Sequence, residues 1–426
     1  MEHSDLSIET LARLLAGRLE HEELLRWIVP HLLELCPTCQ RMHSEIRGLQ
    51  DRVGHWDEEV AVTETRRAPE ILARLEGRSF EHQAAVVERD DELHTWGVCQ
   101  LLLERSQDIL FDEPGRGLEL AELAAQVAEH LGEAYDPHWV WDLRAKAHCQ
   151  VAKALRVLGE LRSSEATFRR AEKCLANSMT GNLKVEAELR LQQGSLRRDQ
   201  LRFADALVFL EKALELYRQE GDADGIALAL LKKAKTLEES GDLSAAVSLL
   251  EQSDGEMVQA SDRRLLSCAR FNRLACLALA GRVEEARGML DEVRSLLTST
   301  ALPLDSVRLR WAESKILHGL GAFAEAEAAL REAQREFLAR RMAYDAATVS
   351  LDLAVLLAQQ GRTQELKELA MEIMPVFESR EIHREAMACL IMFQHACDEE
   401  RLTVELAREL AAILRREQRG CRIVGA

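Results

Sequence analysis

The side chains with the clearest chemical potential stand near the start of the sequence, where His31, Cys36 and Cys39 follow one another closely. Two cysteines separated by two residues form a tight turn that presents two thiolates to one tetrahedral zinc ion. His31 lies on the segment just before this turn and supplies a third ligand, and His3 is the natural fourth. The pattern therefore predicts one structural zinc ion held by His3, His31, Cys36 and Cys39.

Two alternatives to a zinc site remain open for this cysteine pair. If no metal binds, Cys36 and Cys39 are small apolar side chains that pack like other buried cysteines. A redox-active pair is the other alternative, but redox Cys-x2-Cys motifs stand between a strand and a helix, and that context is missing here.

The rest of the sequence lacks the motifs of common enzymes. The thirteen histidines are isolated from the HExxH and paired-carboxylate patterns of hydrolases, and there is no glycine-rich phosphate loop or nucleophile elbow. The other cysteines fall mostly on apolar helical faces, which predicts that they pack in the core. We therefore expect a protein without catalytic activity.

Composition and charge narrow the class of protein further. The 426 residues are 47% apolar and only 4% aromatic, and the net charge is −18. Alanine, leucine, glutamate and arginine dominate, which favours helices over sheets. The negative charge repels phosphate backbones, so nucleic acid is not an expected partner. No run of about 20 apolar residues could cross a membrane and no secretory signal opens the sequence, so we expect a cytoplasmic protein without membrane contact.

A repeat of forty residues organises most of the chain. Glycines spaced forty residues apart each stand between two helical patterns, at Gly241, Gly281, Gly321 and Gly361. Leu201 and Arg401 occupy the equivalent positions one period before and after this series, and Gly159 marks an earlier copy with a slightly longer spacing. A glycine at such a turn supplies a left-handed backbone conformation that other residues adopt only at a steric cost.

The residues that follow each turn repeat as well. An apolar residue comes two positions after the turn, at Leu161, Phe203, Leu243, Val283 and Phe323. A small residue comes at the fifth position, at Ser164, Ala206, Ala246, Ala286 and Ala326, and a large one at the ninth, at Phe168, Leu210, Leu250, Leu290 and Leu330. This rhythm is typical of a helix that packs closely on its partner through one apolar face.

The combination of a small residue in the first helix, glycine at the turn, and alanine then a large apolar residue in the second helix resembles the tetratricopeptide repeat. The resemblance covers about residues 92–418 and implies an all-α, right-handed superhelical array of about eight helical hairpins. The period is forty residues rather than the 34 of that family, and the consensus proline is absent. Longer helices, as in the sensor domains of some bacterial transcription regulators, account for the difference. Residues 51–91 are expected to form a helical linker and residues 419–426 a tail.

The N-terminal segment resembles the zinc-binding anti-sigma domain. SIETLARLLAGRLEHEELLRWIVPHLLELCPTC has that family's helix, Gly-Arg turn and second helix, and it ends in the His–Cys–Cys pattern. Four residues separate His31 from Cys36, where the family has three, so the helix must end before Cys36, as Pro37 favours. The resemblance implies a small helical, zinc-finger-like domain over residues 1–50.

In tetratricopeptide arrays the first helix of each pair lines a concave groove, and the resemblance implies the same here. The repeat frame sends one set of side chains to this groove as candidate partner-binding residues, namely Lys153, Arg156, Arg198, Lys235, Asn272, Arg308, Trp311 and Lys315. Asn272 stands where peptide-binding members of the family often carry an asparagine that holds the ligand backbone. Carboxylates project there too, at Glu188, Asp199, Glu238 and Asp352, so a solvated face of mixed charge is the alternative.

These patterns together predict a non-enzymatic regulator that binds a protein or peptide in the repeat groove. The basic residues of the groove favour an acidic segment or a C-terminal carboxylate as the ligand. The anti-sigma resemblance makes a sigma factor one candidate partner. The alternative is a scaffold or adaptor, or the regulated target of a protease, in a bacterial stress or defence system. The oligomeric state is open.

Overall fold

The fold is that of a helical protein. The computed structural model describes residues 58–132, 135–300, 303–340, 342–378, 393, 396–397 and 403–417, and over these residues it contains helices and turns but no strand. The predicted all-α repeat fold is thus confirmed. The domain predicted over residues 1–50 and the tail predicted over residues 419–426 lie outside the described residues. The right-handed sense of the superhelix stays a prediction.

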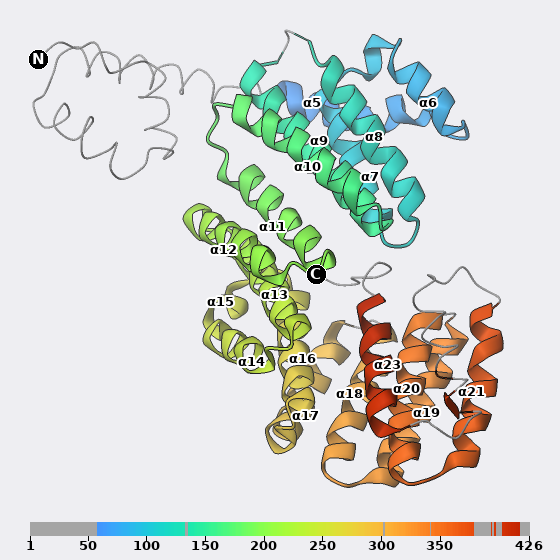
Figure 1. The fold of residues 1–426 in the computed structure, drawn as a ribbon. Coiled ribbons are helices and arrows are strands. Elements are labelled where there is room, and N and C mark those ends of the chain that lie inside the picture. Colours follow the sequence, from blue (N-terminus) through green and yellow to red (C-terminus); the bar gives the residue numbers. More distant parts are fainter. Residues whose placement is uncertain are drawn as a thin grey trace, which may run out of the picture. The chain divides into compact units, whose positions relative to one another are not determined.

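Two compact units divide the chain between Gln193 and Gly194 (Figure 1). The first unit contains α5 (Glu58–Ala73), α6 (Phe80–Val87), the short 3-10 helix η2 (Asp91–Leu93), α7 (Trp96–Ile109), α8 (Pro114–His130), α9 (Pro137–Val157), α10 (Leu161–Asn177) and the start of α11 (Leu183–Asp199).

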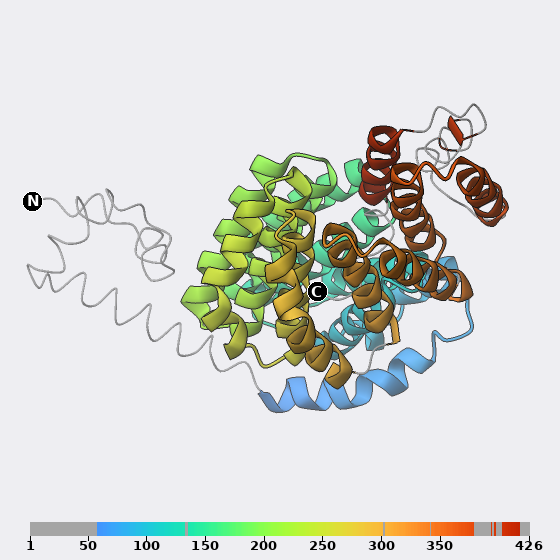
Figure 2. The ribbon, with the colours of Figure 1, turned by 90° about the horizontal axis from the view of Figure 1, so that it is seen from below.

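The second unit contains the rest of α11 and the remaining helices. These are α12 (Phe203–Glu220), α13 (Ala223–Ser240), α14 (Leu243–Gln252), α15 (Asp254–Gln259), α16 (Arg263–Leu279), α17 (Val283–Thr300), α18 (Pro303–Gly319), α19 (Phe323–Ala339), α20 (Ala343–Gln359), α21 (Thr363–Glu378) and α23 (Val404–Glu417). Helices α12, α13, α14 and α16 pack on one another in sequence, as the view of Figure 2 shows.

The turns of the predicted repeat lie where the glycine spacing placed them. The glycines between first and second helices all adopt left-handed backbone conformations, with φ of 82° at Gly159, 92° at Gly241, 76° at Gly281, 78° at Gly321 and 68° at Gly361. Leu201, which occupies the same place between α11 and α12, has φ of 59° and is the one non-glycine residue with positive φ in the described chain. The repeat frame therefore dictates the backbone conformation even where glycine is missing.

Aspartates start several of the helices. The side chain of Asp222 accepts a hydrogen bond from the Gly225 amide at 2.9 Å, and Asp242 accepts one from Ala245 at 2.9 Å at the start of α14. Each carboxylate satisfies a backbone N–H that has no partner within its helix. For α13 the sequence therefore marks both ends, with Asp222 before the first residue and Gly241 after the last.

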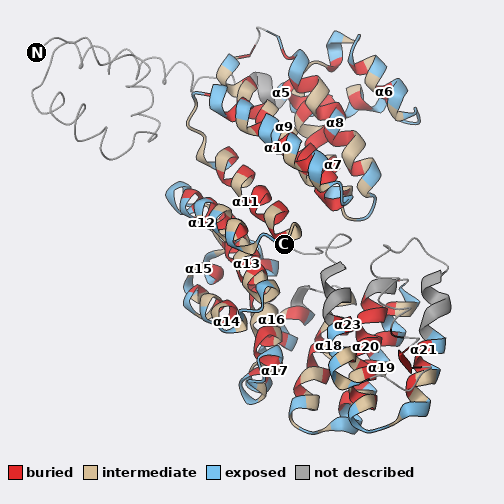
Figure 3. Ribbon diagram, viewed as in Figure 1, coloured by how far each residue is buried: buried red, intermediate tan, exposed pale blue. Residues whose placement is uncertain are grey.

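The second helices bury the predicted face. All five small residues at the fifth position after the turn, from Ser164 to Ala326, are 0% exposed. The large residues four positions later are buried too, except Leu290, which packs partly buried against the same core. Figure 3 shows buried residues on the helix faces that meet one another and exposed residues on the outer faces.

Helices α5 and α6 pack into the core of the first unit. Ala68 and Leu72 of α5 are buried against α7 and α8. Gly97 lets α5 and α7 approach closely, because a methyl group there would come within 2.5 Å of the Glu64 backbone. The Tyr135 hydroxyl donates to Glu64 Oε1 at 2.7 Å and holds the same crossing. The described part of the predicted linker thus belongs to a core.

Ion pairs join each hairpin of the second unit to the next. Lys233 of α13 pairs with Glu211 of α12, and Arg273 of α16 pairs with Glu251 of α14 at 2.7 Å. At the following junction the signs are exchanged, because Arg294 of α17 pairs with Glu313 of α18 at 2.6 Å. The positions on the first helices, 233, 273 and 313, are equivalent in the forty-residue frame.

Candidate functional site

The predicted zinc ligands His3, His31, Cys36 and Cys39 lie outside the described residues, so the zinc site stays a prediction. Elsewhere, in the part of the chain that the structure describes, no three histidine, cysteine or carboxylate side chains come together as a metal site. No described helix is both long and apolar enough to cross a membrane.

The described thiols are packed in the interior, as their helical positions predicted, except Cys268, which is partly exposed. Cys99, Cys149, Cys174, Cys276 and Cys397 are buried. Burial raises the pKa of Cys99 and Cys149 well above the usual range, and it raises the pKa of Cys276 to about 12. These thiols therefore stay protonated near neutral pH and lack the thiolate that nucleophilic or redox chemistry requires.

In the first unit, α9 carries the predicted groove residues Lys153 and Arg156. Lys153 is partly buried, and its charge and that of Glu188 both act on the Cys149 thiol, so a cation and a carboxylate of the predicted face lie near one another. Arg156 is only 3% exposed. Arg156 is therefore part of the interior and does not present its guanidinium to solvent.

In the second unit, Arg198 of α11 is also buried among carboxylates. It donates to Asp199 Oδ1 at 2.9 Å and lies 3.5 Å from Glu239 Oε2 of α13, and the Arg198 and Glu239 side chains are 2% and 1% exposed. Burial alone would lower the pKa of Arg198, but the negative charges of Asp199 and Glu239 outweigh it and raise that pKa. Arg198 thus joins two successive first helices.

Lys235 of α13 is more exposed but is also paired. Its ammonium lies 2.9 Å from both carboxylate oxygens of Glu238, one turn further along the same helix. On α18, Arg308 lies 4.0 Å from Asp305. Asn272 of α16 is partly buried, and its amide hydrogen-bonds to no described residue. The predicted cations of this unit therefore each have a carboxylate nearby.

Polar and aromatic side chains surround Trp311 on this face. We call Trp311, Lys315, Phe337 and Asp352 the Trp311 cluster. Trp311 Nε1 donates to Asp352 Oδ2 at 2.8 Å, and Lys315 Nζ lies 3.4 Å from the same oxygen. The Lys315 ammonium lies over the indole, 4.8 Å from the ring centroid, and the edge of Phe337 meets the ring at 6.1 Å. An aromatic ring, a cation and a carboxylate are thus held together between α18 and α20.

Two partners that organise this face, Glu239 and Asp352, have a signal in the sequence. Glu239 follows Arg198 by forty-one residues, and Asp352 follows Trp311 by the same interval. His318 bonds to Gln359 with this interval too, at 2.5 Å. In a forty-residue repeat, residues about one period apart lie side by side on successive first helices. A search for complementary side chains at this interval would have paired Arg198 with Glu239 and Trp311 with Asp352.

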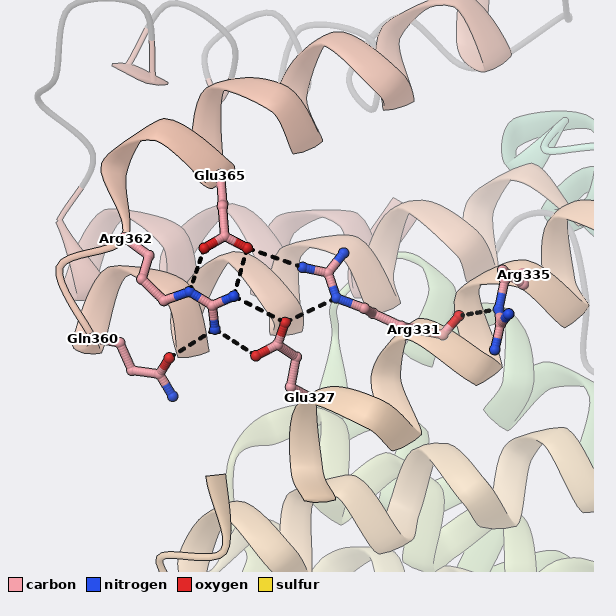
Figure 4. Close-up of polar contacts among 6 residues, drawn as sticks. All are labelled: Glu327, Arg331, Arg335, Gln360, Arg362 and Glu365. Atoms are coloured by element: carbon pink, nitrogen blue, oxygen red, sulfur yellow. Dashed lines mark hydrogen bonds and ion pairs between the residues drawn. The ribbon is translucent and has the colours of Figure 1, made fainter. Parts of the chain in front are cut away.

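A second polar network lies on the second helices, centred on Arg362 in the turn after α20 (Figure 4). Its guanidinium bonds to Glu327 of α19 and Glu365 of α21, and also to Gln360 at 2.9 Å. Hydrogen bonds from Arg362 lower the pKa of both Glu327 and Glu365. Arg331 donates to Glu327 at 2.9 Å and completes the group. The network joins the hairpin of α20 and α21 to the preceding helix α19, because its members come from α19, the turn and α21.

Comparison with known proteins agrees with this architecture. Residues 185–253 match the tetratricopeptide repeat family. The sequence matches none of the curated proteins with which it was compared.

Solved structures share the fold at low sequence identity. The chain is similar to aspartyl phosphate phosphatase F from Bacillus subtilis, with a TM-score of 0.56 and 12% identity over 87% of this chain and 94% of that one. It is similar to a Rap protein complexed with Competence and Sporulation Factor, with a TM-score of 0.53 and 12% identity over 74% of this chain and 88% of that one. The apo form of RapI gives a TM-score of 0.50 and 13% identity over 84% and 98% of the two chains. The family match over residues 185–253 and these likenesses, together with the left-handed turns and the buried small residues, show a tetratricopeptide-like helical repeat fold.

Proposed function

We propose that this chain is a non-enzymatic regulator that binds a peptide, or a segment of a partner protein, on the first helices of its second unit. The observation that carries the proposal is the Trp311 cluster. Trp311 is partly buried, and its indole is held by Asp352 and Phe337 rather than being free to rotate. Ordered aromatic side chains are the commonest anchors of protein interfaces, because they bury a large area at a small entropic cost.

The comparisons support a binding role in general. One similar structure holds a Rap protein with Competence and Sporulation Factor bound. A repeat array presents successive helices side by side and so offers an extended surface to a partner. Because one fold hosts many functions, the proposal rests on the Trp311 cluster and takes only support from these likenesses.

The proposal includes a role for the N-terminal segment. Residues 1–50 would bind one zinc ion through His3, His31, Cys36 and Cys39 and modulate a sigma factor, as the anti-sigma resemblance implies. Elemental analysis of protein purified without chelator tests the metal, with one zinc per chain expected and none expected after Cys36→Ser with Cys39→Ser. Zinc-free wild-type protein would remove this part of the proposal and leave the binding surface untouched.

The binding role is tested by affinity capture of the full chain in its native cell. Trp311→Ala is compared with wild type and with Val208→Ala, which removes an apolar side chain that is 70% exposed on the second helix α12. A partner retained by wild type and Val208→Ala but lost with Trp311→Ala supports the proposal. Retention of the same proteins by all three chains contradicts it and favours the scaffold alternative.

A further inference from the structure

The cation of the Trp311 cluster comes from the chain itself. Lys315 Nζ lies 4.8 Å from the centroid of the Trp311 ring and 3.4 Å from Asp352 Oδ2. An aromatic face with a carboxylate beside it is the arrangement by which proteins bind cationic side chains. Trp311 and Asp352 therefore already have the form of a cation site, and Lys315 occupies it.

The ring and the carboxylate are held independently of Lys315. The indole N–H is bonded to Asp352 at 2.8 Å, and the ring rests on Phe337, which is 0% exposed. Lys315, by contrast, has a flexible stem, and its side chain is 22% exposed. Partly exposed ion pairs and cation–π contacts are weak interactions. The ammonium is thus the member of the cluster that another cation can replace most easily.

Charge favours a basic partner over an acidic one. The chain carries a net charge of −18, which attracts cationic segments and repels anionic ones. An acidic ligand would also have to displace carboxylates already in place, Glu238 from Lys235 and Asp352 from Lys315. Both considerations favour a basic ligand, whereas the basic residues alone had favoured an acidic one from sequence.

We propose that Trp311 and Asp352 bind an arginine side chain of the partner, and that Lys315 is a built-in occupant that leaves when the arginine enters. A guanidinium suits this site better than a second ammonium, because it is weakly hydrated, stacks flat on an aromatic ring and donates two parallel hydrogen bonds to a carboxylate. The inference rests on the proposed function for the location of the partner, but its chemistry can be tested without one.

The test uses the full chain labelled with 5-fluorotryptophan. The protein has six tryptophans, and Trp311→Phe assigns the fluorine signal of Trp311. The probes are N-acetyl-arginine methylamide and its neutral isostere N-acetyl-citrulline methylamide. In Lys315→Ala the arginine probe should shift the Trp311 signal saturably, at a concentration about tenfold lower than in wild type. Adding Asp352→Asn should abolish that shift.

Controls separate local from general effects. Lys212→Ala removes the same charge from the second helix α12, where Lys212 is exposed, and it should behave like wild type. If Lys315→Ala disturbs the other five fluorine signals, Lys315→Gln keeps the length of the side chain and carries the same expectation.

Three results would overturn the inference. They are an arginine probe that leaves Trp311 unmoved in both Lys315 variants, a citrulline probe that acts equally well, and an N-acetyl-glutamate methylamide probe that binds wild type but not Lys315→Ala. If the probes fail but Trp311→Ala still loses a partner that wild type retains, this inference is wrong and the proposed function stands. If the arginine probe binds but no such partner is found, the cation site stands and the proposed function is wrong.

Discussion

Arg198 offers the sharpest test of how the first helices are held together. Replacing it with methionine removes the guanidinium that lies 3.5 Å from Glu239, whose side chain is 1% exposed, and takes a hydrogen bond from Asp199. A carboxylate left buried without its counter-charge typically costs about 3–5 kcal/mol. Because Asp199 is more exposed than Glu239, we expect Arg198→Met to lower the free energy of unfolding of the second unit by about 3 kcal/mol.

Urea unfolding followed through Trp311 measures this loss. Trp311 is the only tryptophan between Gly194 and Ala426, so its 5-fluoro signal reports on the second unit separately from the first. Arg202→Met is the matched control. Its pair with Asp205 is about half exposed on both sides and should contribute no more than about 0.5 kcal/mol.

The double variant Arg198→Met with Glu239→Leu completes the test. It removes both buried charges, so it should be more stable than Arg198→Met alone by about 1–3 kcal/mol. A loss below about 1 kcal/mol in Arg198→Met would refute the reasoning. It would mean that water reaches the guanidinium, and Arg198 would then be available to a ligand as the sequence had suggested.

Three further predictions concern packing and pH. Ala286→Trp places a large ring at a 0% exposed contact between paired helices and should destabilise the second unit by about 1–3 kcal/mol in urea unfolding. Gly225→Ala brings a methyl group within 2.3 Å of the Tyr217 ring and should cost about 1–3 kcal/mol in the same assay. Arg362→Gln should be less stable than wild type at neutral pH, because the lowered pKa of Glu327 means that its carboxylate stabilises the folded state. That difference in melting temperature should shrink as the pH falls from about 4.5 through the lowered pKa of Glu327, where its carboxylate becomes protonated in the folded state.

Each of these has a clear contrary outcome. Wild-type stability in Ala286→Trp would mean that the repeat frame misplaces the helix contact. Unchanged stability in Gly225→Ala would mean that the ring moves aside freely. A melting difference that persists in acid for Arg362→Gln would show that Arg362 acts through packing rather than charge.

Sequence was sufficient for the backbone of the repeat because each requirement is local. The turn glycine predicts a left-handed turn, and the small residue five positions later predicts a close helix contact. Leu201 was placed correctly although it is not glycine, since the pattern around it carried the frame. The sequence pattern also predicts which side chains share one face of a helix, and Trp311 and Lys315 do lie together.

The sequence did not predict how deeply the groove residues are buried or which carboxylate pairs with which cation. Arg156 and Arg198 were both predicted to face the groove, yet both are buried. Which carboxylate meets which cation depends on how one hairpin packs on the next, and this is set by many side chains at once. The forty-one-residue interval from Arg198 to Glu239 was available in the sequence, but it acquires meaning only once the packing of successive first helices is known.

The ion pairs between hairpins bear on how such a chain could have grown. Duplicated repeats share one apolar frame, so on packing grounds any hairpin could follow any other. The charges at the junctions disfavour some orders of the hairpins. Moving the α18 hairpin behind α12 would put Glu313 in the place of Lys233, facing Glu211, so that two carboxylates would meet where an ion pair now stands. The repeats therefore differ in charge although they share one apolar pattern. A variant of the protein with its hairpins in another order should be less stable than the natural chain.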